Sequence, residues 1–77
     1  MNSIQRFKLN IDKWRKLGLN SNDPELSDMY AKDAKDLTVI YDAYVQGDYR
    51  KALMNTNRLD TIVRDQIPLS VYNDITK

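Results

Sequence analysis

Apolar residues recur at intervals of three and four along three segments of this chain. At about 100° per residue, such intervals place side chains on one side of a helix. The first segment carries the pattern at Ile4, Phe7, Ile11, Trp14 and Leu17. The second carries it at Leu26, Met29, Tyr30, Leu37, Ile40, Tyr41 and Tyr44, and the third at Tyr49, Ala52, Leu53, Thr56, Leu59 and Val63. No segment alternates with the period of two that marks a strand, so the pattern predicts an all-α fold.

Residues typical of helix starts precede each of these segments. Asn2 or Ser3 can act as the N-cap of the first helix, since either side chain can accept a hydrogen bond from the first turn. Asp23 followed by Pro24 is typical of the start of a second helix, and Asp48 can cap a third.

The two glycines of the chain, Gly18 and Gly47, follow the first and second apolar segments. Glycine reaches the left-handed conformation that often ends a helix, so both are expected to be C-terminal caps. After Gly18, we expect Leu19 to fold back toward Trp14 in a Schellman ending.

Pro68 is expected to end the third helix by about Ile67, and a short final helix can follow with Ser70 as its cap. The expected helices cover about residues 3–17, 24–46, 49–67 and 69–75, within a single domain of residues 1–77. The predicted architecture is a compact three-helix bundle with a short C-terminal fourth helix.

Charge is distributed unevenly, although the net charge of the 77 residues is only +1. Residues 1–20 contain five basic residues and one acidic residue, whereas residues 21–48 contain two basic and seven acidic residues. The first two helices are therefore expected to carry opposite charge. No apolar run approaches the roughly 20 residues of a membrane span, and no hydrophobic leader is visible, so we expect a cytoplasmic protein that does not enter a membrane.

The chain offers little material for catalysis, because it contains no histidine and no cysteine. This removes the commonest general base, the thiol nucleophile and most transition-metal sites. Asn20, Asn22 and Glu25 suggest a loop of oxygen ligands, but the glycine and late glutamate of a calcium-binding loop are missing. We expect no enzymatic activity, no metal and no cofactor.

Residues 47–53, Gly-Asp-Tyr-Arg-Lys-Ala-Leu, form the one short motif. It resembles the turn between the two helices of a tetratricopeptide repeat, where an aromatic residue packs the corner and an alanine allows close helix approach. The tryptophan and the Leu-Gly pair of that repeat are absent, and there is no second copy. The resemblance therefore implies an antiparallel helical hairpin and nothing more.

Aromatic residues and one carboxylate are candidates for binding a partner protein: Trp14, Tyr30, Asp33, Tyr41 and Tyr44. Tyrosine and tryptophan are enriched at binding hot spots, although in so small a protein such rings also belong at the edge of the core. Asp33 interrupts the apolar face of the second helix. It can pair with a basic residue of the chain such as Arg58 or Arg64, or it can anchor an arginine of a partner.

The basic first helix supports an alternative hypothesis, in which Arg6, Lys8, Lys13 and Arg15 contact the phosphates of a nucleic acid. A net charge of +1 is low for a nucleic-acid-binding domain, and the same side chains can cover the core edge while their charges face water.

The favoured interpretation is a non-enzymatic module that binds another protein, with a host protein or a second copy of the chain as candidate partners. In its small size, helical pattern and lack of cysteine and histidine, the chain resembles the small accessory proteins of bacteriophages and mobile elements. That resemblance implies a protein that inhibits or modulates a host protein by covering its surface.

Overall fold

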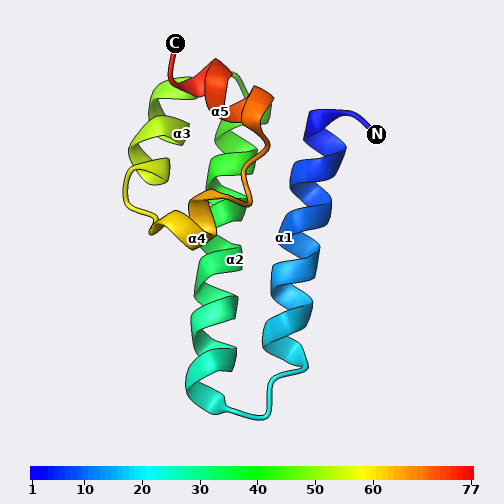
Figure 1. Cartoon of the computed structure of the whole chain (residues 1–77). Coiled ribbons are helices and arrows are strands. Elements are labelled where there is room, and N and C mark those ends of the chain that lie inside the picture. Colours follow the sequence, from blue (N-terminus) through cyan, green and yellow to red (C-terminus); the bar gives the residue numbers. More distant parts are fainter.

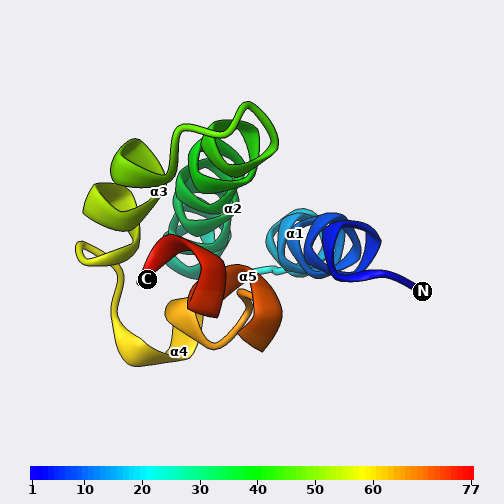
Figure 2. The same cartoon turned by 90° about the horizontal axis from the view of Figure 1, so that it is seen from above.

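The computed structural model describes all 77 residues and contains five helices and no strand. They are α1 (Ser3–Leu19), α2 (Pro24–Val45), α3 (Tyr49–Thr56), α4 (Thr61–Arg64) and α5 (Leu69–Ile75). The two long helices α1 and α2 form an antiparallel hairpin, and α3 packs beside the end of α2 (Figure 1). Seen along the hairpin, α4 and α5 form a second layer across one side of it (Figure 2). The predicted all-α bundle is confirmed.

The three predicted helix starts are also confirmed. The Asn2 side chain accepts a hydrogen bond from the Gln5 amide at 2.8 Å, and the Gln5 side chain accepts one from the Asn2 amide at 3.2 Å. This reciprocal pair is a capping box. Asp23 caps α2 through the Glu25 amide at 2.9 Å, and Asp48 caps α3 through the amide three residues further on. Only α5 lacks a side-chain cap, so the expected role of Ser70 there is wrong.

Gly47 ends α2 as expected. It is the only residue with a positive φ, at 80°, and its amide donates to the Tyr44 carbonyl at 3.0 Å. The Asp48 amide donates to the Ala43 carbonyl at 2.8 Å. These two bonds make a Schellman motif, which satisfies carbonyls that the end of a helix leaves free.

The prediction that Gly18 ends the first helix is wrong. Helix α1 continues through Leu19, which is 78% exposed and does not fold back, and Asn20 is the C-cap. Gly18 is buried against α2, where an added Cβ would lie 3.1 Å from the Cβ of Tyr30 and 3.2 Å from the Ser27 carbonyl oxygen. The Ser27 hydroxyl donates to the Gly18 carbonyl at 2.8 Å. Gly18 therefore serves the close approach of two helices.

The single helix expected at residues 49–67 is also wrong, because the chain breaks between Thr56 and Thr61 into α3 and α4. Asp60 accepts a hydrogen bond from the Val63 amide at 3.2 Å and so starts a new helix. Asparagine and aspartate side chains compete with helical hydrogen bonds, which favours such a break around Asn57 and Asp60. The apolar spacing runs through the break and gives no sign of it.

Twelve buried apolar residues form one core. They come from all five helices and from the segments that connect α3, α4 and α5: Phe7, Ile11, Ala34, Leu37, Ile40, Ala43, Ala52, Leu59, Val63, Ile67, Val71 and Ile75. Thr56 is buried with them, and its hydroxyl donates to the Ala52 carbonyl at 2.7 Å. The two ends of the first apolar segment, Ile4 and Leu17, are exposed instead of buried.

The two glycines predict different responses to substitution. Gly47→Val is expected to lower the free energy of unfolding by about 1–2 kcal/mol, because a β-branched residue is strained at positive φ, whereas Gly47→Asn is expected to cost less. Gly18→Val is expected to cost about 1–3 kcal/mol by overpacking, and Gly18→Asn is expected to give no such relief. Urea unfolding followed by circular dichroism measures all four variants. Equal losses for Gly18→Asn and Gly47→Asn would contradict the two assigned roles.

Candidate functional site

The covering layer of the hairpin stops at α4, so the half of the hairpin that includes the α1–α2 loop has no third helix over it (Figure 1). There the core-facing stripes of both helices continue into solvent. Leu17 is 48% exposed, Leu26 is 42% exposed and Met29 is 46% exposed. Together with the half-buried rings of Trp14 and Tyr30, these side chains form a surface that we call the open face.

Trp14 and Tyr30 join the two helices within the open face. Their ring centroids are 5.4 Å apart with an interplanar angle of 77°, which is the favourable edge-to-face arrangement. The indole nitrogen of Trp14 is buried and makes no hydrogen bond within the chain. A tryptophan N–H usually has a partner when buried, and the Asp33 carboxylate is the acceptor near this one.

Asp33 lies one turn along α2 from Tyr30, at the boundary between the open face and α4, and is half-buried. Burial raises the pKa of its carboxyl group. The nearby Trp14 N–H opposes the rise, the carboxylates of Asp60 and Asp36 add to it, and Lys32 lowers it. The N–H of Trp14 is therefore close enough to act on the charge, although it makes no hydrogen bond of ordinary geometry.

The expected pairing of Asp33 with Arg58 or Arg64 is wrong. Neither arginine forms an ion pair, because the two ion pairs of the structure are Arg15–Asp12 and Lys77–Asp74. Arg64 instead donates to the Leu59 carbonyl at 2.9 Å, across the turn that joins α3 to α4. Asp33 thus faces other carboxylates without a cation bound to it.

Tyr41 and Tyr44 lie away from the open face, in the covered half. The Tyr41 ring meets Phe7 edge to face at 5.6 Å, and the Tyr44 ring stacks on Tyr49 at 5.3 Å. The Tyr44 hydroxyl donates to the Asp74 carboxylate at 2.5 Å, which fixes α5 to the end of α2. The structure therefore brings together three of the five candidate residues, Trp14, Tyr30 and Asp33, and leaves the two other tyrosines in structural contacts.

The four basic candidates of α1 do not share one surface. At 100° per residue, Arg6 and Lys13 lie on one flank of the helix and Lys8 and Arg15 on the other. Arg15 is held by Asp12 at 3.3 Å and reaches the Thr38 hydroxyl on α2 at 3.5 Å. The flanks are separated by the face that packs on α2, so the four charges do not form a single strip.

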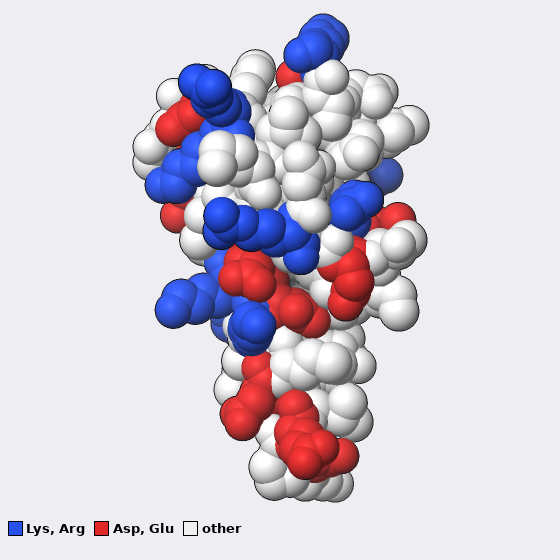
Figure 3. All heavy atoms as spheres, turned by 90° about the vertical axis from the view of Figure 1, so that its left-hand side faces the viewer, with Lys and Arg blue, Asp and Glu red and all other residues white.

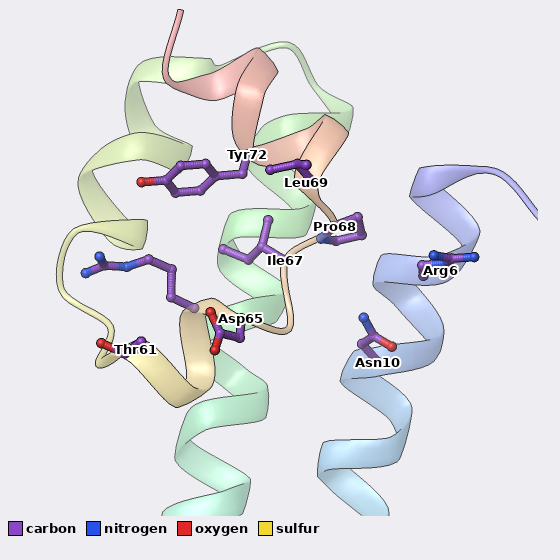
Figure 4. A pocket seen from close by; sticks show the side chains of 9 residues that line it. Arg6, Asn10, Thr61, Asp65, Ile67, Pro68, Leu69 and Tyr72 are labelled. Atoms are coloured by element: carbon purple, nitrogen blue, oxygen red, sulfur yellow. The ribbon is translucent and has the colours of Figure 1, made fainter.

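A hollow of about 620 Å³ opens between α1 and the segment from α4 to α5 (Figure 4). Arg6 and Asn10 line it from α1, and Asn10 donates to the Gln66 carbonyl at 2.9 Å. The other lining residues are Thr61, Arg64, Asp65, Ile67, Pro68, Leu69 and Tyr72. This hollow contains one carboxylate and no paired acid and base, and no group of three or more potential metal ligands occurs in the structure.

Charge also separates along the molecule. On the side shown in Figure 3, lysine and arginine side chains gather over the half that contains α3, whereas acidic side chains occupy the end of the hairpin. That end includes Asp23, Glu25 and Asp28 in the first turns of α2. The open face therefore ends beside an acidic tip.

Comparisons of the chain with known protein families, with curated proteins and with solved structures find no match. None of the five helices combines the length and the apolar character that crossing a bilayer requires.

The sequence marked Trp14, Tyr30 and Asp33 as candidates, but its pattern placed Leu17, Leu26 and Met29 on the apolar stripes without separating them from the core residues. Helical spacing cannot separate a covered stripe from an uncovered one, because both have the same period. The signal that could have separated them is Asp60, whose side chain caps a new helix, α4, within the stretch expected to be a single third helix.

The Tyr44–Asp74 hydrogen bond predicts a loss of stability in alkali. Together with burial, this bond raises the pKa of Tyr44 to about 12. The unfolded chain releases this proton near the ordinary value of about 10. The stabilisation is therefore complete below pH 10 and is lost as the pH rises toward 12.

Tyr44→Phe is expected to lower the free energy of unfolding by about 1 kcal/mol at pH 8. Between pH 10 and 12, the free energy of unfolding of this variant is expected to fall less steeply than that of the parent chain. Urea unfolding at a series of pH values measures both. Parallel pH profiles for the two proteins would show that the bond carries no such linkage.

The raised pKa of Asp33 predicts a pH dependence of stability opposite to that of a carboxylate that stabilises the fold in its charged form. Folding is favoured while Asp33 is protonated, so its contribution is largest below the ordinary value of 3.8 and is lost as the pH rises through the raised value. Asp33→Asn removes this ionisation. The variant is therefore expected to unfold at a higher urea concentration than the parent chain at pH 7, with the difference shrinking toward pH 3. A variant that is less stable at pH 7 would indicate that the Asp33 charge is satisfied in the fold.

Proposed function

We propose that this protein is a non-enzymatic interaction module that binds another protein through the open face. One observation carries the proposal: the apolar stripes of α1 and α2 extend past the last covering helix and leave Leu17, Leu26 and Met29 exposed on the two helices that the Trp14 and Tyr30 rings join. Contiguous apolar surface of this kind marks interaction sites, whereas single exposed apolar residues are ordinary.

The composition of the open face fits a binding hot spot. Trp14 and Tyr30 are half-buried and held against each other, so a partner would meet rings that have already lost conformational freedom. The surrounding Leu17, Leu26 and Met29 supply adaptable apolar contact, methionine above all. A partner that covers them would also stabilise the folded hairpin by mass action.

The chain has no histidine, no cysteine and no cluster of metal ligands, so the module acts by binding to a surface of its partner. Covering a functional surface of the bound protein is the effect that such a module produces, in agreement with the inhibitory or modulating role expected from its sequence class.

Two lysine variants of matched residue type test the proposal. Met29→Lys places a charge on the open face, and Met54→Lys places the same charge on α3, where the parent side chain is 54% exposed against 46% for Met29. Each purified chain is immobilised and exposed to an extract of its own source cells. We expect a protein retained by the parent chain and by Met54→Lys but lost by at least tenfold from Met29→Lys, while circular dichroism shows both variants folded.

Equal retention by Met29→Lys, or no protein retained above bare resin, would overturn the proposal. Retention of nucleic acid that falls steeply with added salt and does not change with Met29→Lys would instead support the contact through Arg6, Lys8, Lys13 and Arg15.

A further inference from the structure

The open face is a side of two packed helices that no further helix covers (Figure 1). In the covered half, the same stripe of α2 that carries Leu37 and Ile40 is buried under Leu59, Val63 and the segment leading to α5. In the open half, no further helix lies over α1 and α2 (Figure 1), and Leu17, Leu26 and Met29 are exposed. Two packed antiparallel helices with a bare apolar side accept a third helix between them, as in any helical bundle.

The length of the open face limits what can bind there. From the start of α2 at Pro24 to Asp33 there are ten residues, which span about 15 Å at the helical rise of 1.5 Å per residue. A helix of about three turns fills this length. Its apolar side chains would recur at intervals of three and four, so that three or four of them contact the stripes of α1 and α2.

The charge of the open face further limits what can bind there. Asp33 lies at the end of the open face beside α4, close to Asp36 on the same helix and to Asp60 at the start of α4. None of these three carboxylates forms an ion pair. The nearest cation that acts on Asp33 is Lys32. A basic side chain that enters here would meet three carboxylates, and an arginine could also stack on the aromatic rings of Trp14 or Tyr30.

A second copy of the chain fits the open face poorly. If two open faces met in antiparallel orientation about a two-fold axis, α1 would lie on α1, and Lys13, which lies on the same side of the helix as Leu17, would face the basic α1 of the other copy. In the parallel orientation, the layers of α4 and α5, which stand on the same side as the open face, would collide (Figure 2). Both arrangements are therefore disfavoured.

We propose that the open face binds a short amphipathic α-helix of a partner protein, which completes a three-helix layer in the uncovered half of the hairpin and directs an arginine or lysine to Asp33. The inference rests on the proposed function and specifies the chemistry of the partner at the same surface. Apolar contact supplies the affinity, and the basic side chain at Asp33 fixes the direction and register of the bound helix.

A selection from random helices tests the proposal on the full chain. A displayed library of 14-residue helix-forming peptides, with seven randomised positions on one face, is selected against the parent protein. We expect enriched peptides with apolar residues at intervals of three and four and with one recurrent arginine or lysine. Their affinity is expected to fall about tenfold for Asp33→Asn, as for the loss of a charged hydrogen-bonding partner, and to stay unchanged for Met54→Lys.

A charge exchange makes the assignment specific. A selected peptide in which the basic residue is replaced by glutamate is expected to bind Asp33→Lys more tightly than it binds the parent chain. Enrichment of no helix, enrichment without a recurrent basic residue, or binding that Asp33→Asn leaves unchanged would each overturn the proposal. Dimers of the parent chain that Met29→Lys dissociates would overturn it as well, since the occupant would then be a second copy.

Failure of this inference is separable from failure of the proposed function. A cellular partner that is lost with Met29→Lys but unaffected by Asp33→Asn, and that the selected helices do not displace, leaves the interaction surface in place and refutes the basic helix. A partner unaffected by Met29→Lys refutes both.

Discussion

The break between α3 and α4 is the constraint on which the rest of the molecule depends. Helix α3 ends after only eight residues, and Asp60 then accepts a hydrogen bond from the Val63 amide as the N-cap of α4. Eight residues span about 12 Å, whereas the 22 residues of α2 span about 33 Å. The chain after the break turns back over the hairpin, so Leu59, Val63 and Ile67 close the core of one half. The other half is left with two helices and no cover.

The uncovered half must hold together through contacts between α1 and α2 alone. Gly18 permits the two backbones to approach, and the Ser27 hydroxyl bonds to the Gly18 carbonyl at the point of approach. One turn away, the Trp14 and Tyr30 rings meet edge to face. A two-helix hairpin buries little surface by itself, so these contacts replace the packing that a third helix provides elsewhere. The same contacts also keep the open face in a fixed shape.

Asp33 connects stability with the proposed function. A half-buried carboxylate among other carboxylates opposes folding at neutral pH, because its charge loses hydration without gaining a cation. Such a residue is a poor choice for stability alone. It becomes favourable once a basic group arrives with a partner, since the local charge then is paired and the Trp14 ring is covered. Functional sites commonly break the rules that the remaining sequence obeys.

The sequence alone determined the helical class, the three helix starts and the role of Gly47 as a C-terminal cap, because caps and glycine conformations depend on residues a few positions apart. It also named Trp14, Tyr30 and Asp33 among five candidate residues, but the structure alone showed that these three lie together. Tertiary structure decided the role of Gly18, which ends no helix but meets Tyr30 across the hairpin, and it decided which parts of the apolar stripes are covered. Leu37 and Leu26 occupy the same stripe of one helix with the same spacing, yet one is buried and the other exposed. The difference lies in how far α3–α5 reach along the hairpin, and that distance depends on long-range packing that no local pattern records.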